Sequence, residues 1–204
     1  MMELPETQSM LDVVDFLISL ESREERNKIL EDEEMRKTLI PEKDVEFFEQ
    51  TRRNEFNHVK HVQTSFNRLF PEIECHHDHT KDEFYMVMTI TAFDFKLKDK
   101  LSQDLWQYEL DRHFKAEPHH PEYEKLNEKE GLRIKDMDIA EMAVDRLSRN
   151  LQFNGGEYNE EAIIKYAPKF VYDPEQRLEL YLKYVYQFKD TVKSVWDEMK
   201  RDQL

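Results

Sequence analysis

Glycine is almost absent from this chain, which has 3 glycines and 7 prolines in 204 residues. Antiparallel sandwiches and barrels need many tight turns, and glycine supplies most of the backbone conformations that such turns require. Apolar residues instead recur at helical spacing over long stretches, and no segment shows the strict alternation that is typical of strands. The sequence therefore predicts an all-α fold.

The apolar spacing also predicts where the helices lie. Two stretches, 11–20 and 23–39, come before a break at Pro41, and Ser9 or Thr7 is placed to cap the first. Further helices are expected over residues 45–70, 82–95, 101–115, 136–153 and 160–166, followed by a long final helix that opens at residues 173–175. Residues 154–156, Asn-Gly-Gly, are a typical helix end.

Charge distinguishes the start of the chain from the rest. The net charge is −15, and residues 1–50 hold 6 Lys and Arg against 15 Asp and Glu. We expect residues 1–41 to form an acidic helical extension and residues 42–204 to form the main domain. The apolar stripe of the last helix suits either the core or a helix of a partner, so a homodimer is compatible with the sequence.

The composition argues against several classes of partner. A strongly acidic surface repels phosphate backbones and anionic lipids, so general nucleic-acid binding is not expected. No apolar run approaches the roughly 20 residues that span a bilayer. The single Cys75 allows no internal disulfide, and the acidic N-terminus has no signal-peptide pattern, so we expect a cytoplasmic protein.

The histidines carry the clearest functional signal. All eight lie between residues 58 and 120, at His58, His61, His76, His77, His79, His113, His119 and His120. Imidazole is the commonest metal-ligating side chain, so this concentration indicates metal binding. Asp138, Glu141 and Asp145 follow on one predicted helix face. The set suits one or two divalent ions, and the sequence leaves open whether the ion is Mn, Fe, Co, Ni, Mg or Zn.

The order His, His-Asp, His, His, Asp resembles the HD superfamily of metal-dependent phosphohydrolases, which are helical bundles. The likeness is closer to an uncharacterised family of bacteria, phages and large DNA viruses. That family combines His-Asp-x-Ser-Lys, His-His-Pro-Glu-His/Tyr and Asp-x-x-Glu-Met-x-x-Asp elements, which correspond here to residues 77–81, 119–123 and 138–145. Thr80 replaces the serine and keeps its hydroxyl. The likeness covers about residues 50–170.

The resemblance implies a set of metal ligands, namely His61, His77, Asp78, His113, His119, His120 and Asp145. Three choices stay open at this point. Either His119 or His120 joins His113 as a ligand of a second ion. Either His58 or His61 is the first ligand, and we prefer His61. Asp138 competes with Asp145 as the last ligand, although Asp138 also suits a helix cap.

The implied activity is hydrolysis of a phosphate ester, in a nucleotide or another small phosphorylated metabolite. Asp78 would ligate or bridge the metal, and Lys81 would contact phosphate. Glu141 would ligate, act as a general base, or hold a ligand histidine in place. Two alternatives remain, which are a di-iron oxygenase built on the same ligands and a non-catalytic interaction module that binds metal for stability.

Overall fold

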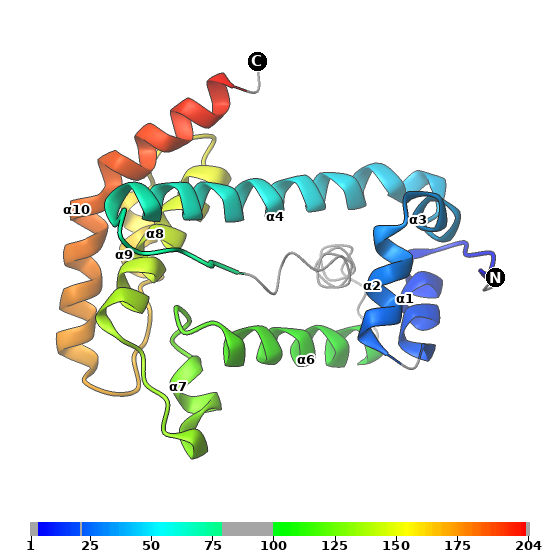
Figure 1. Ribbon diagram of the computed structural model, residues 1–204, viewed down its shortest axis with the longest axis horizontal. Coiled ribbons are helices and arrows are strands. Elements are labelled where there is room, and N and C mark those ends of the chain that lie inside the picture. The colour runs from blue at the N-terminus through cyan, green and yellow to red at the C-terminus, as the bar shows by residue number, and fades with distance from the viewer. Residues whose placement is uncertain (1–3, 21, 79–99, 203–204) are drawn as a thin grey trace. The chain divides into compact units, whose positions relative to one another are not determined.

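The computed structural model describes residues 4–20, 22–78 and 100–202, and Figure 1 shows the arrangement of its helices. All regular structure in these residues is helical, which confirms the predicted fold class. The helices are α1 (Met10–Ser19), α2 (Arg23–Glu31), α3 (Glu33–Leu39), α4 (Glu42–Leu69), α6 (Lys100–Ala116), α7 (Tyr123–Leu126), the 3-10 helix η2 (Glu128–Glu130), α8 (Asp136–Phe153), α9 (Glu160–Lys165) and α10 (Pro174–Arg201).

Several predictions from the sequence fall outside the described residues. The expected helix over 82–95, the phosphate contact Lys81 and the histidine His79 all belong to this group. Within the described ranges, no helix is both long enough and apolar enough to cross a membrane.

Contacts group the described residues into two units. The N-terminal unit contains residues 4–56 and 100–112, and the C-terminal unit contains residues 57–78 and 113–202. The boundary therefore falls within α4 and within α6. The division of the chain at residue 41 that we expected from charge and Pro41 stays a prediction.

The N-terminal unit has its own apolar core. Leu17 of α1, Leu30 of α2 and Leu39 of α3 are fully buried in it. The sequence predicted one stretch over residues 23–39, but the structure has two helices there. Asp32 ends α2 and its side chain accepts a hydrogen bond from the Met35 amide at the start of α3, because aspartate is a strong N-cap residue.

The C-terminal unit is built on the packing of α8 along α10 (Figure 1). Its core contains buried residues from both helices and from the end of α4, including Leu147, Tyr181, Phe188, Val62 and Phe66. Apolar residues at helical spacing in all three helices explain this arrangement, since each helix must bury one stripe.

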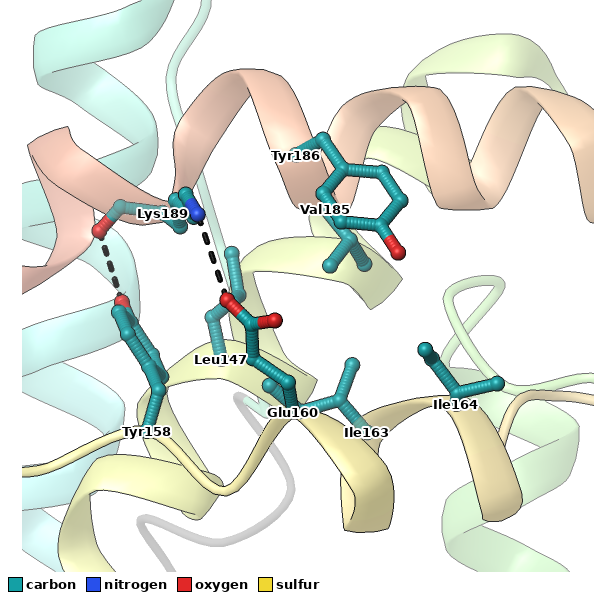
Figure 2. A pocket seen from close by; sticks show the side chains of 8 residues that line it. All are labelled: Leu147, Tyr158, Glu160, Ile163, Ile164, Val185, Tyr186 and Lys189. Atoms are coloured by element: carbon teal, nitrogen blue, oxygen red, sulfur yellow. Dashed lines mark hydrogen bonds and ion pairs between the residues drawn. The ribbon is translucent and has the colours of Figure 1, made fainter.

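Helix α9 joins the same unit beside a small pocket. Figure 2 shows Leu147, Ile163 and Val185 lining this pocket. The Tyr158 hydroxyl donates a hydrogen bond to the Lys189 carbonyl at 2.8 Å, and the Lys189 ammonium lies 3.4 Å from the Glu160 carboxylate (Figure 2). These contacts fix the segment before α9, and the start of α9 itself, to α10.

The end of α8 needs glycine at one position. As predicted, α8 ends at Phe153, and the Gly156 amide then donates to the Leu151 carbonyl at 2.8 Å. Gly156 has φ +95°, and a Cβ at this position would lie 2.7 Å from Nε1 of Trp196. Both the left-handed backbone of Gly156 and its short distance to Trp196 disfavour any residue with a side chain.

We expect Gly156→Ala to lower the free energy of unfolding by about 2–3 kcal/mol, because the left-handed backbone costs roughly 1–2 kcal/mol and the clash adds to it. Gly155→Ala is the matched control, since Gly155 has φ +65° and no described atom within 4 Å of the added Cβ. It should cost only the backbone strain. Equal losses in chemical denaturation would contradict the contact with Trp196.

Candidate metal centre

Side chains from several segments of the C-terminal unit meet in one buried cluster. We call it the histidine–carboxylate cluster; its members are His58, His77, Asp78, His113, His119, His120, Glu141 and Asp145. His58 comes from α4, His113 from α6, and Glu141 and Asp145 from α8. The other members lie in the loop after α4 and in the turn after α6. Groups of three within this cluster have their ligand atoms close enough together to hold a metal ion.

Asp78 lies at the centre of the cluster and is 1% exposed. Its backbone is left-handed, with φ 51°, a conformation that aspartate tolerates better than most residues. Its Oδ2 atom lies 3.1 Å from Nε2 of His77, whereas Oδ1 lies 3.2 Å from Nε2 of His113 and 3.2 Å from Nε2 of His119. The two oxygens of one carboxylate therefore face two different groups of histidines.

The first group combines His58 and His77 with two carboxylates. Nε2 of His58 is 2.8 Å from Oδ1 of Asp145, and Nε2 of His77 is 3.7 Å from the same oxygen. Neither nitrogen has a hydrogen-bond partner in the described part of the chain, although carboxylate oxygens lie within bonding distance.

The spacing of these atoms matches that of ligands around one ion. Two ligands at right angles, each about 2.1 Å from a metal, lie about 3.0 Å from each other. The 2.8 Å between His58 and Asp145 and the 3.1 Å between His77 and Asp78 are close to this value. Nitrogen and oxygen atoms that approach without hydrogen-bonding are explained if all of them are directed at a common point.

The second group lies on the other oxygen of Asp78. Nε2 of His113 is 2.8 Å from Nε2 of His120, and the latter is 3.9 Å from Oδ1 of Asp78. His119 lies between Asp78 and Glu141, and neither of its ring nitrogens makes a hydrogen bond to a described residue. This group offers up to three imidazoles to a second ion.

Glu141 lies beside the Nδ1 atoms of two histidines, on the side of each ring away from Asp78. Its Oε1 atom lies 3.0 Å from Nδ1 of His77 and 3.1 Å from Nδ1 of His119. Carboxylates that hold the outer nitrogen of a ligand histidine orient the ring and increase its basicity. The contact with His77 fits the holding of a ligand histidine, whereas Glu141, His77 and His119 together also have ligand atoms close enough to hold an ion, so both roles stay open.

The pKa values of the cluster show that its carboxylates attract positive charge. Burial disfavours the charged forms of His77 and His119, but the nearby carboxylates, Asp78 first, raise the pKa of both imidazoles above its usual value. Burial likewise opposes ionisation of Glu141, yet His119 and His77 lower its pKa to about 2. Asp78 and Glu141 thus attract protons onto His77 and His119, whereas burial lowers the pKa of His58 and of His120 to about 3 and keeps these two imidazoles neutral. A divalent cation would satisfy the carboxylates and could be ligated by the neutral imidazoles.

His61 is not brought into the cluster. Its Nδ1 atom lies 2.6 Å from the Ser148 hydroxyl, and its Nε2 atom lies 2.9 Å from the Val192 carbonyl, so both nitrogens are engaged. His58, the alternative to our preferred His61, faces Asp145 instead. The sequence could not separate the two, because residues three apart share one helix face.

The structure also separates Asp138 from Asp145, the two candidates for the last metal ligand. Asp138 Oδ2 accepts a hydrogen bond from the Lys135 amide at 2.6 Å, so Asp138 caps the start of α8. Asp145 lies seven residues further along the same helix, against His58. His76, next to His77 in the sequence, has a side chain that is 72% exposed.

Comparison with known families gives one match. The family of unknown function DUF5662 matches residues 46–195. The chain belongs to this family. The DUF5662 match includes every member of the histidine–carboxylate cluster, and it confirms the predicted likeness to an uncharacterised family. No curated protein and no solved structure matches the chain, and membership of the HD superfamily stays a prediction.

Proposed function

We propose that this DUF5662 protein is a metal-dependent hydrolase of phosphate esters that acts on a nucleotide or another small phosphorylated metabolite. The observation that carries the proposal is the convergence of His58 and His77 on the carboxylates of Asp145 and Asp78, at 2.8 and 3.1 Å, within a cluster whose ligand atoms lie close enough together to hold an ion. In this proposal His58, His77, Asp78 and Asp145 hold one divalent ion. His113, His119 and His120 hold a second ion on the other oxygen of Asp78.

The donor set fits such ions. Imidazole and carboxylate together suit Mn, Fe, Co, Ni and Zn, whereas Mg prefers oxygen ligands alone. The members His58, His77 and His119 are at most 3% exposed, so their nitrogens would be costly to leave without partners. A cation between them and the carboxylates removes that cost.

The ion, Glu141 and Lys81 then each have a defined role in the proposed reaction. A divalent ion in this position supplies Lewis acidity toward phosphate oxygens and lowers the pKa of a coordinated water. Glu141 orients His77 through its outer nitrogen, Nδ1, which lies 3.0 Å from Oε1. Lys81, which lies outside the described residues, is proposed to contact the phosphate.

Metal analysis and an activity screen test the proposal together. We expect one to two equivalents of a transition metal in protein purified without chelator. We also expect release of phosphate from nucleotides or sugar phosphates after loading with Mn²⁺, Co²⁺ or Ni²⁺. His77→Ala should lower both readouts. Metal well below one equivalent, unaffected by His77→Ala, would contradict the proposal.

The same donor set is compatible with iron-dependent oxygen chemistry, since histidine and carboxylate ligands also suit Fe²⁺. Two outcomes would replace the phosphohydrolase proposal. An iron absorption band in the visible region with no phosphate release would favour a di-iron oxygenase. Stoichiometric metal without either activity would favour a metal-stabilised interaction module.

A further inference from the structure

A chain of buried polar groups runs behind His58, on the side away from Asp145. Nδ1 of His58 lies 3.3 Å from the Ser148 hydroxyl, which lies 2.6 Å from Nδ1 of His61. Nε2 of His61 lies 2.9 Å from the Val192 carbonyl. The chain connects α4, α8 and α10, and each of its members is at most 3% exposed.

The Val192 carbonyl, at one end of this row of hydrogen bonds, determines where each proton lies. A carbonyl only accepts hydrogen bonds, so Nε2 of His61 must carry hydrogen and donate to Val192. Neutral His61 then has a lone pair on Nδ1, which accepts the Ser148 hydroxyl proton. Ser148 has no second proton, so its oxygen accepts from His58, and Nδ1 of His58 carries the hydrogen.

If the hydrogen bonds between His58, Ser148 and His61 ran in the opposite direction, His61 would have to be charged. If Ser148 donated to His58, Nδ1 and Nε2 of His61 would both have to be donors, which is the imidazolium form. His61 is 1% exposed, and its two bonded partners are an uncharged hydroxyl and an uncharged carbonyl. An ion buried against neutral groups is strongly disfavoured, so we assign the first direction.

We propose that Ser148 and His61 are positioning residues for the metal centre, which hold His58 as the tautomer with hydrogen on Nδ1. This tautomer leaves a lone pair on Nε2, the nitrogen that lies 2.8 Å from Asp145. Two electron-rich atoms at this distance repel unless a cation lies beside both, so the chain keeps His58 ready to ligate. The inference rests on the proposed metal site and adds a role for two residues outside it.

The test compares two buried serines. Ser148→Ala removes the link, whereas Ser65→Ala is the matched control, because Ser65 lies on α4, is fully buried and has no hydrogen-bond partner among the described residues. Long-range ¹H–¹⁵N correlation on metal-free protein reports which nitrogen of His58 carries hydrogen. We expect hydrogen on Nδ1 in wild type and Ser65→Ala, and a mixture of the two tautomers in Ser148→Ala, where Nδ1 has lost its acceptor.

Titration with Co²⁺, followed by visible absorption, gives the second readout. Loss of an outer partner of a ligand histidine lowers metal affinity about 10- to 100-fold, so we expect this loss in Ser148→Ala and none in Ser65→Ala. Ser148→Thr, which keeps the hydroxyl, should restore most of the affinity and the wild-type tautomer.

The outcomes separate this inference from the proposed function. Equal Co²⁺ affinity in wild type and Ser148→Ala, or hydrogen on Nε2 of His58 in the wild type, overturns the positioning role and leaves the metal site intact. Failure of wild type to bind Co²⁺ overturns the proposed function and this inference with it. Loss of affinity in both serine variants identifies a packing effect and also overturns the inference.

Discussion

Replacing His77 by alanine should remove the stabilisation that the ion between His58, His77 and Asp145 gives this protein, whereas replacing its neighbour His76 should not. His77 is fully buried, and its Nε2 atom lies 3.1 Å from Asp78, while the His76 side chain is 72% exposed. At a free metal concentration 100 times Kd, a bound ion stabilises the fold by about 2.7 kcal/mol. In a chain of this length that corresponds to a rise in Tm of about 5–10 °C.

Thermal unfolding with Mn²⁺ and then with a chelator measures this difference. Wild type and His76→Ala should each lose about 5–10 °C on chelation, whereas His77→Ala should lose clearly less, because only the ion on the other oxygen of Asp78 could still bind. Because the two histidines are adjacent, a general effect of altering this loop would act on both variants. Similar responses to chelation in all three proteins would contradict a metal site at His77.

The second large effect separates two aspartates of α8. Asp145→Asn replaces the carboxylate that lies 2.8 Å from His58 by a neutral amide and should lower metal affinity by more than about 100-fold. Asp138→Asn keeps a side-chain oxygen that can accept the Lys135 amide, so capping and metal affinity should both persist.

Calorimetric titration with Mn²⁺ on chelator-treated protein measures both affinities. Both variants change one carboxylate to an amide on the same helix, so they remove the same charge from the protein. A larger loss in Asp138→Asn than in Asp145→Asn would show that the wrong aspartate has been assigned to the ion.

The sequence predicted most of the fold because helical spacing and helix boundaries are local properties. The end of α8 before Asn154-Gly155-Gly156 and the start of α10 at Pro174 both follow from residues that favour those boundaries. The division of residues 23–39 at Asp32 was missed. Asp32 can equally sit on an exposed helix face, and only its bond to the Met35 amide shows the cap.

The candidate site was only partly predictable. The order of residue types together with the family resemblance implied that His77, Asp78, His113, His119, His120 and Asp145 belong together, and the structure brings them into one cluster. The role of His58 could not be derived, because His58 and His61 lie on the same side of one helix. What distinguishes them is the contact of each with α8 and α10, through Asp145, Ser148 and Val192. Such contacts between distant segments have no signature in the spacing of one helix.

The most direct test of the central claim is anomalous diffraction at the metal edge from crystals grown with Mn²⁺ or Co²⁺. We expect a peak about 2.0–2.2 Å from Nε2 of His58, Nε2 of His77 and a carboxylate oxygen of Asp145. A second peak is expected between Asp78 and His113. A cluster without any anomalous peak, in crystals where metal is present in excess, would contradict the metal centre and the function proposed from it.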